Sequence, residues 1–179
     1  MSTETDVSIL FVDDEKPVVA ALQRVFADEP YEVRTCTDPH VALSEITANA
    51  PTVVVADYYM PGMQGPALLK RVREIDDGII RVILTGKPDV TAVLDAVKNG
   101  AVYRFILKPW DDDDLRMTIR QAVDYARLLG ERNALRRALA RQRGAPEEVH
   151  AGVTRPPTCD EGGAVVLTPR DLPPGGARR

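Results

Sequence analysis

The sequence predicts an α/β domain in which a doubly wound, five-stranded parallel sheet has helices on both faces. Short apolar runs rich in valine and isoleucine alternate with longer segments whose apolar residues recur three and four positions apart. The segments between them are short and rich in turn-forming residues. Strands that alternate with helices in this way form a parallel sheet covered on both sides, with right-handed crossovers.

The elements follow one another in a regular order along the chain. Strands are expected where β-branched residues cluster, over 7–12, 31–36, 53–57, 79–85 and 102–107. Helices are expected where the apolar spacing is helical, over 16–27, 39–49, 66–75 and 90–98. Asp38 is a good N-cap for the second helix, with Pro39 at its first position. The acidic run 111–114 begins a fifth, long helix, because negative charges suit a helix N-terminus better than they indicate a metal site here.

Composition excludes several classes of protein. The chain has 179 residues, 44% of them hydrophobic, which is enough for a core. A net charge of −4 gives no general attraction to nucleic acid or anionic membranes. Cys36 and Cys159 form no CxxC pair, and the polar, acidic start of the chain is unlike a signal peptide. No apolar run reaches the roughly 18 residues of a membrane span. We therefore expect a cytoplasmic protein that does not act on membranes.

The C-terminal part of the chain differs from the rest. The last helix continues past Gly130 to about Arg143, although a glycine costs roughly 1 kcal/mol there relative to alanine. We expect a domain over 1–129, a helical extension over 130–143 and a disordered tail over 144–179, where six of the 14 prolines and six of the 12 glycines fall.

The helical extension leaves three interpretations open. Six arginines and one glutamate lie between Arg127 and Arg143, which is typical of a solvated helix end with cations near its C-terminus. A basic helix also suits an acidic partner or nucleic acid. Finally, Leu128, Leu135 and Gln142 lie seven apart with Leu139 between, which indicates a short coiled-coil homodimer.

Five polar residues each follow one of the apolar runs. Because the carboxyl ends of parallel strands share one edge of the sheet, we expect these residues to converge there: Asp13, Asp14, Asp57, Thr85 and Lys108. Three clustered carboxylates are tolerable beside a divalent cation, and a partly hydrated site of this kind suits Mg²⁺. A lysine and a hydroxyl complement a phosphoryl group. The expected chemistry is in-line phosphoryl transfer to Asp57.

Residues 1–129 resemble a receiver domain of the bacterial two-component response regulators. The resemblance is carried by Asp13-Asp14, the segment 57–65 with Met60-Pro61 and Gly65, Thr85-Gly86 and Lys108-Pro109. It implies a flavodoxin-like sheet of strand order 2-1-3-4-5. It implies that Asp57 accepts phosphate from a histidine kinase or phosphotransfer protein, and that Asp13, Asp14, Asp57 and the Tyr59 carbonyl form the Mg²⁺ site, Asp13 through water. Thr85 and Lys108 would bind phosphoryl oxygens, with a cis Lys108-Pro109 bond.

The resemblance also implies a switch and slow autodephosphorylation rather than conventional enzyme activity. Thr85 would move toward the phosphate and Phe105 would follow, with Tyr103 the weaker candidate for this role. Tyr59 and Lys87 occupy positions that affect the lifetime of the phosphate. The run 102–110 is similar to receivers followed by a long helix and an output domain. Because such a domain does not follow here, we expect the output to be an unknown partner protein, a dimer contact, or only the passage of phosphate along a relay.

Other functions remain as alternatives. Haloacid dehalogenase phosphohydrolases share the Asp, Thr, Lys and Mg²⁺ set, but their nucleophile follows the first strand in an Asp-x-Asp motif, unlike Asp57. A module that binds partners without phosphorylation would not need the intact set of five residues. A DNA-associated regulator would act through the basic helix, but no nucleic-acid-binding residue is assigned. His40 and His150 have no metal-ligand or phosphorelay context.

Overall fold

The computed structural model describes residues 7–86 and 102–142 and confirms the predicted parallel sheet. Its five strands run in the order β2-β1-β3-β4-β5, and all the pairings are parallel. The strands are β1 (Ser8–Val12), β2 (Glu32–Cys36), β3 (Val53–Asp57), β4 (Ile80–Thr85) and β5 (Arg104–Leu107). They differ from the predicted ranges by at most two residues at an end. The order places β1 and β3 side by side at the centre, where the chain crosses from one half of the sheet to the other.

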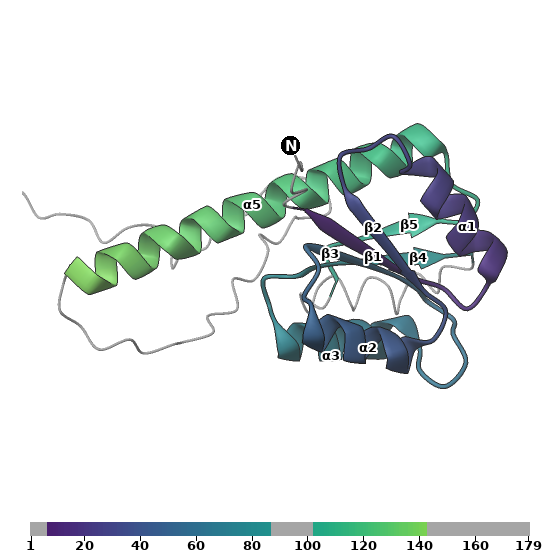
Figure 1. Cartoon of the computed structure of the whole chain (residues 1–179), viewed down its shortest axis with the longest axis horizontal. Coiled ribbons are helices and arrows are strands. Elements are labelled where there is room, and N and C mark those ends of the chain that lie inside the picture. The colour runs from purple at the N-terminus through teal and green to yellow at the C-terminus, as the bar shows by residue number, and fades with distance from the viewer. Residues whose placement is uncertain (1–6, 87–101, 143–179) are drawn as a thin grey trace, which may run out of the picture.

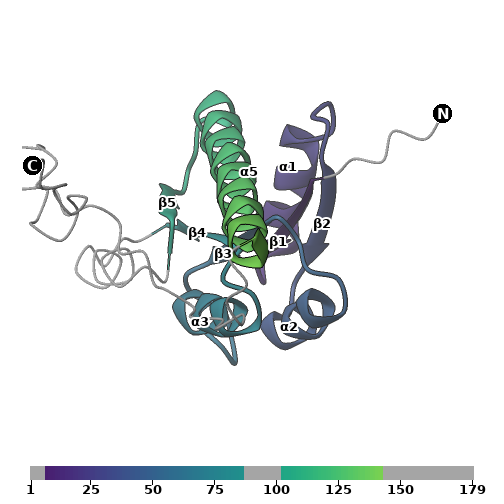
Figure 2. The same cartoon turned by 90° about the vertical axis from the view of Figure 1, so that its left-hand side faces the viewer.

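In the described part of the chain, four helices cover the two faces of the sheet. They are α1 (Lys16–Val25), α2 (Pro39–Ala48), α3 (Gly65–Ile75) and α5 (Asp112–Gln142). Seen along α5, this helix and α1 lie over one face of the sheet, whereas α2 and α3 lie over the other (Figure 2). The expected helix over 90–98 lies outside the described residues. Both faces of the central strands are therefore covered, as their unbroken apolar runs require.

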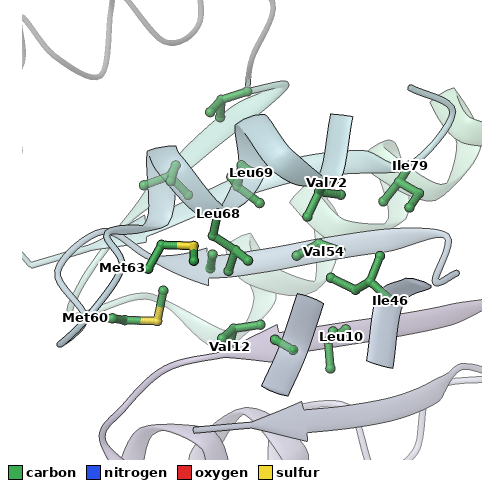
Figure 3. Close-up of a cluster of buried hydrophobic side chains, with 14 of the residues drawn as sticks. Leu10, Val12, Ile46, Val54, Met60, Met63, Leu68, Leu69, Val72 and Ile79 are labelled. Carbon is green, nitrogen blue, oxygen red and sulfur yellow. The ribbon is translucent and has the colours of Figure 1, made fainter. Parts of the chain in front are cut away.

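Two apolar clusters fill the spaces between the layers. One lies between the sheet and α2 and α3 (Figure 3), and its side chains include Leu10, Val12, Ile46, Val54, Leu68, Leu69 and Val72. The other lies under α1 and α5 and includes Ile9, Phe11, Leu22, Val55, Leu115 and Ile119. Successive strand residues point to opposite faces, so neighbours such as Val54 and Val55 enter different clusters. Every residue of β3 is buried, and this fixes the strand that ends in Asp57.

Two predicted helix starts are confirmed by their caps. The Asp38 carboxylate accepts hydrogen bonds from the backbone N–H groups of His40 and Val41, and Pro39 begins α2. Asp111 caps α5 in the same way, accepting from the N–H groups of Asp113 and Asp114. The acidic run therefore begins a helix, as its residue types indicated.

The last helix is much longer than the sheet is wide. It has 31 residues and runs without a break through Gly130, which corresponds to about 47 Å at 1.5 Å per residue. Figure 1 shows its first half packed on the sheet and its second half extending away from the rest of the described structure. The division of the chain at residues 129 and 143 stays a prediction, and the expected tail over 144–179 lies outside the described residues. None of the described helices is both long and apolar enough to span a bilayer.

Candidate functional site

Lys108 joins two strand ends at the carboxyl edge of the sheet. Its Nζ lies 2.6 Å from Oδ2 of Asp13, which follows β1, and 2.7 Å from Oδ1 of Asp57, the last residue of β3. The Glu15 carboxylate is farther away, at 4.0 Å. Both aspartates are buried, whereas Lys108 is partly accessible. Three residues that are far apart in sequence thus form one ion-paired group, as their positions after apolar runs predicted.

The Asp57 carboxylate is held on its other side by its own loop. The backbone N–H of Tyr59 donates to Oδ2 of Asp57 at 2.8 Å. The same loop is anchored to β4, since the N–H of Tyr58 donates to the carbonyl of Leu84 at 2.9 Å. One carboxylate oxygen therefore faces Lys108 and the other faces the backbone, so the orientation of Asp57 is fixed.

Gly65 lets the end of the loop return close to Asp57. Its N–H donates to the carbonyl of Tyr58 at 3.0 Å as α3 begins. A Cβ atom added at Gly65 would lie only 2.1 Å from the carbonyl oxygen of Asp57 and 3.2 Å from Cδ1 of Ile83. Only glycine fits this close approach between two backbone segments. The sequence identified Gly65 only as part of the motif 57–65. The physical reason for a glycine at this position is visible only in the structure.

Asp13 is held by groups that the sequence did not identify. Its N–H donates to the carbonyl of Cys36 at the end of β2, at 3.1 Å, and its Oδ1 accepts the N–H of Glu15 at 2.9 Å. Burial raises the pKa of Asp13, although the hydrogen bond from Lys108 opposes this effect. A backbone carbonyl leaves no mark in side-chain patterns, so Cys36 carried no signal for this role.

Lys108 is a stable cation in this position. Burial disfavours its charged form, but the hydrogen bonds to Asp13 and Asp57 together outweigh burial and raise the pKa of Lys108. Its backbone N–H donates to the carbonyl of Thr85 at 2.8 Å, which ties the ends of β4 and β5 together. The Lys108-Pro109 bond is cis, as expected.

Comparison with known proteins adds to this geometry. The family model of the response regulator receiver domain matches residues 9–120. The chain belongs to the receiver domain family. Its members act in two-component signalling, interact with histidine kinases or phosphotransfer proteins and in general bind Mg²⁺ for phosphorylation.

Individual relatives support the assignment of the chain to this family. The receiver is 32% identical over 113 residues to sporulation initiation phosphotransferase F of Bacillus subtilis, covering 63% of this chain and 90% of that protein. It is 34% identical to the hydrogenase transcriptional regulatory protein HoxA of Cupriavidus necator, covering 74% of this chain but only 27% of HoxA. The chain thus spans less than a third of the length of this transcriptional regulator.

Solved structures of receiver domains also match this chain. The signal receiver domain of an HD-domain-containing protein from Pseudomonas fluorescens superposes with a TM-score of 0.68 at 30% identity, covering 74% of this chain and 97% of that one. A receiver domain from Clostridium thermocellum gives a TM-score of 0.64 at 28% identity, covering 69% of this chain and 98% of the other.

The remaining predicted site residues of the receiver lie in different surroundings. Thr85 ends β4 and is completely buried, whereas Asp14 is exposed beside the buried Asp13. Tyr59 is exposed and its ring contacts that of Tyr58. Phe105 lies on β5 opposite Ile83, with 39% of its surface exposed. Lys87 lies outside the described residues.

The charges at the site leave room for a divalent cation. The ion-paired group contains two carboxylates, those of Asp13 and Asp57, and one ammonium, that of Lys108, which leaves one negative charge uncompensated, and the exposed Asp14 is next to Asp13 in the sequence. Among the described residues, no group of three or more His, Cys, Asp or Glu side chains could hold a metal ion. Mg²⁺ needs fewer, because it keeps several waters and takes one or two carboxylates. The donor set fits a hydrated Mg²⁺ ion.

Proposed function

We propose that Asp57 accepts a phosphoryl group from a sensor histidine kinase or a phosphotransfer protein. The observation that carries the proposal is the ion-paired group of Asp13, Asp57 and Lys108 at the carboxyl edge of a receiver sheet. Asp57 is a carboxylate with a fixed orientation at the end of a fully buried strand. These properties suit a nucleophile whose reaction depends on positioning.

Phosphoryl transfer to Asp57 needs no general base. A carboxylate oxygen of Asp57 forms a new P–O bond while the bond between phosphorus and the donor's nitrogen breaks, and the electron pair leaves with the donor. A carboxylate oxygen can attack phosphorus directly, unlike a hydroxyl or thiol nucleophile, which must first lose a proton. Lys108 already lies 2.7 Å from the carboxylate, so its ammonium is placed to neutralise charge on the phosphoryl oxygens as they arrive. Thr85, at the neighbouring strand end, would donate its hydroxyl to another of these oxygens.

The metal site is assigned to the same edge. We assign Asp14, Asp57 and the backbone carbonyl of Tyr59 as ligands, with Asp13 acting through a bound water. When bound, Mg²⁺ supplies positive charge that offsets the phosphoryl oxygens and the clustered carboxylates. Asp13 is kept in place for this by two backbone hydrogen bonds, one to Cys36 and one from Glu15.

Signalling would follow from movement at the site. Thr85 is buried at the end of β4 and Phe105 lies on the adjacent β5, so a shift of Thr85 toward a phosphoryl group can change the surroundings of Phe105. Because Phe105 has no hydroxyl, its change of position would be read through burial and shape. The receiver would thereby alter the surface that it offers to a downstream partner protein.

A mass measurement tests the phosphoacceptor. The wild type, Asp57→Asn and the matched control Asp38→Asn are incubated with Mg²⁺ and a small-molecule phosphodonor, and their intact masses are recorded. Asp38 caps α2 and lies outside the ion-paired group. We expect one added phosphoryl group in the wild type and in Asp38→Asn, and none in Asp57→Asn or when Mg²⁺ is chelated. Equal labelling of all three proteins would overturn the assignment, and labelling of none would favour a binding module that works without phosphorylation.

A further inference from the structure

Four side chains fasten the beginning of β5 to the middle of α5. The rings of Tyr103 and Tyr125 are stacked, with 5.0 Å between their centroids and 19° between their planes. The Arg104 guanidinium lies 5.8 Å from the centroid of the Tyr103 ring, within the range of a cation–π contact. Its Nη1 donates a hydrogen bond of 2.7 Å to Oε1 of Gln121, one turn before Tyr125. We call these four residues the clasp.

The clasp lies close to the point where α5 loses its support. Ala126 and Leu129 still pack against the apolar cluster under α1 and α5, whereas every residue from 130 to 139 is exposed. Figure 1 shows this second half of α5 extending beyond the other described elements. Within the described residues, the packing that holds α5 therefore ends about one turn after the clasp.

The projecting half of α5 depends on the half that is packed. A short helix on its own is only marginally stable in water, because its first turn fixes several dihedral angles for one hydrogen bond. The projecting segment also begins with Gly130, which has a low helix propensity. Helical order over 130–142 must therefore propagate from the packed half, and its extent depends on how firmly the preceding turns are held.

The clasp belongs to the same strand as the predicted switch residue Phe105. Arg104 directly precedes Phe105 in β5, and the backbone N–H of Tyr103 donates to the carbonyl of Arg81 in β4 at 2.7 Å. A displacement of β5 relative to α5 would lengthen both the hydrogen bond to Gln121 and the contact between the two rings. Both kinds of contact weaken as their geometry departs from the optimum. The position of β5 therefore determines how tightly the clasp closes.

We propose that the clasp couples the position of β5 to the helical order of residues 130–142, so that a shift of Phe105 lets this end of α5 unwind. The trigger of the shift, phosphorylation of Asp57, rests on the proposed function, but the coupling rests on the clasp contacts alone. A helix whose ordered length follows the position of Phe105 offers a partner protein two different surfaces. The clasp residues lie outside the ion-paired group, so they act as positioning residues and take no part in phosphoryl transfer.

Hydrogen–deuterium exchange of the full chain without a phosphodonor tests the role of the clasp. Tyr125→Leu removes the ring contact but raises the helix propensity, so faster exchange cannot come from a weaker local preference for helix. We expect amide exchange over 130–139 to become about 2- to 10-fold faster, which matches the usual strength of an aromatic pair. Gln121→Ala removes only the hydrogen bond from Arg104 and should have a smaller effect in the same direction. The matched control Met117→Leu changes another exposed side chain of α5 and should leave this exchange unchanged.

Substitution of the switch residue distinguishes coupling from simple support of the helix. Phe105→Ala should speed exchange over 130–139 in the wild-type background but add little in Tyr125→Leu, because the clasp is already open there. Phe105→Leu, a smaller change, should act in the same direction, and thermal melting checks that each variant is folded. Additive effects of the substitutions at 105 and 125 would overturn the proposal, as would unchanged exchange in Tyr125→Leu.

Phosphorylation tests the trigger. The wild type and Tyr125→Leu are incubated with Mg²⁺ and a small-molecule phosphodonor, and intact mass is recorded alongside exchange. We expect equal phosphorylation of both proteins, faster exchange over 130–139 in the wild type and no further rise in Tyr125→Leu. A phosphorylated wild type with unchanged exchange would overturn the proposal. Absence of phosphorylation would instead overturn the proposed function, and the Phe105 variants would still decide whether the clasp couples β5 to the helix.

Discussion

Replacing Gly65 with alanine should damage the site without touching a charged group. The backbone of Gly65 has no positive φ, since Gly62 alone among the described residues does, so alanine can adopt its conformation. The cost is therefore steric. The new Cβ would lie 2.1 Å from the Asp57 carbonyl oxygen and must move to at least 3.0 Å, which requires a shift of about 0.9 Å between two backbone segments. A backbone carbonyl cannot rotate aside as a flexible side chain can.

The magnitude follows from this shift. Overpacking of this kind costs typically about 1–3 kcal/mol, and the better helix propensity of alanine returns up to about 1 kcal/mol. We therefore expect a net loss of about 1–2 kcal/mol in the free energy of unfolding. The rate of phosphoryl transfer to Asp57 should be affected more strongly than the stability, because a misplacement of about 1 Å at a reacting group can slow a reaction roughly 100-fold. We expect phosphoryl incorporation to slow by about 10- to 100-fold.

Urea unfolding and the initial rate of phosphoryl incorporation measure the two effects. Gly130→Ala is the matched control, because no atom lies within 4 Å of the added Cβ and α5 gains helix propensity. This variant should gain up to about 1 kcal/mol and be phosphorylated at the wild-type rate. A Gly65→Ala protein with wild-type stability and rate would refute the steric reasoning.

Three further variants or conditions probe the charges. Lys108→Met leaves the Asp13 and Asp57 carboxylates without their shared cation. The free energy of unfolding in urea should fall by roughly 2–4 kcal/mol, less than for a fully buried pair because Lys108 is partly exposed. Unchanged stability would contradict the ion pairing. The pKa of Lys108 is raised, so its stabilising effect is complete below its usual value of 10.5 and is lost as the pH rises through the folded-state value. The stability difference between wild type and Lys108→Met should accordingly shrink at strongly alkaline pH, and a difference that stays constant there would argue against this pairing. Asp111→Ala removes the cap of α5 and should cost about 1 kcal/mol, visible in thermal melting; no change would mean that the cap adds nothing.

Local patterns were sufficient to predict most of the fold. The valine run before Asp57 predicted a buried strand with a carboxylate at its end, because burial on both faces demands continuous apolar residues. Asp38 and Asp111 marked helix starts, since capping depends on residue types next to one another. The convergence of Asp13, Asp57 and Lys108 followed from topology, because parallel strands end at one edge.

Such local patterns could not predict contacts between segments that are far apart in the sequence. Arg120 pairs with Glu29 at 2.7 Å, and the Arg116 side chain donates to the carbonyl of Val25, although 91 residues separate each pair. These bonds join the end of α1 to α5 and depend on how the two helices pack. The support of Asp13 by the Cys36 carbonyl was equally hidden, because every residue has a carbonyl and only the register of β1 and β2 selects this one.

The residue that carries the phosphoryl group can be located by peptide mass spectrometry. The full chain is phosphorylated in the presence of Mg²⁺, treated with borohydride, which reduces an aspartyl phosphate but not a free aspartate or a phosphate ester, and digested for peptide mass spectrometry. We predict reduction at Asp57 alone, and none when Mg²⁺ is chelated. Reduction at a different aspartate, or a phosphoryl group that resists borohydride, would contradict the assignment of Asp57 as the phosphoacceptor.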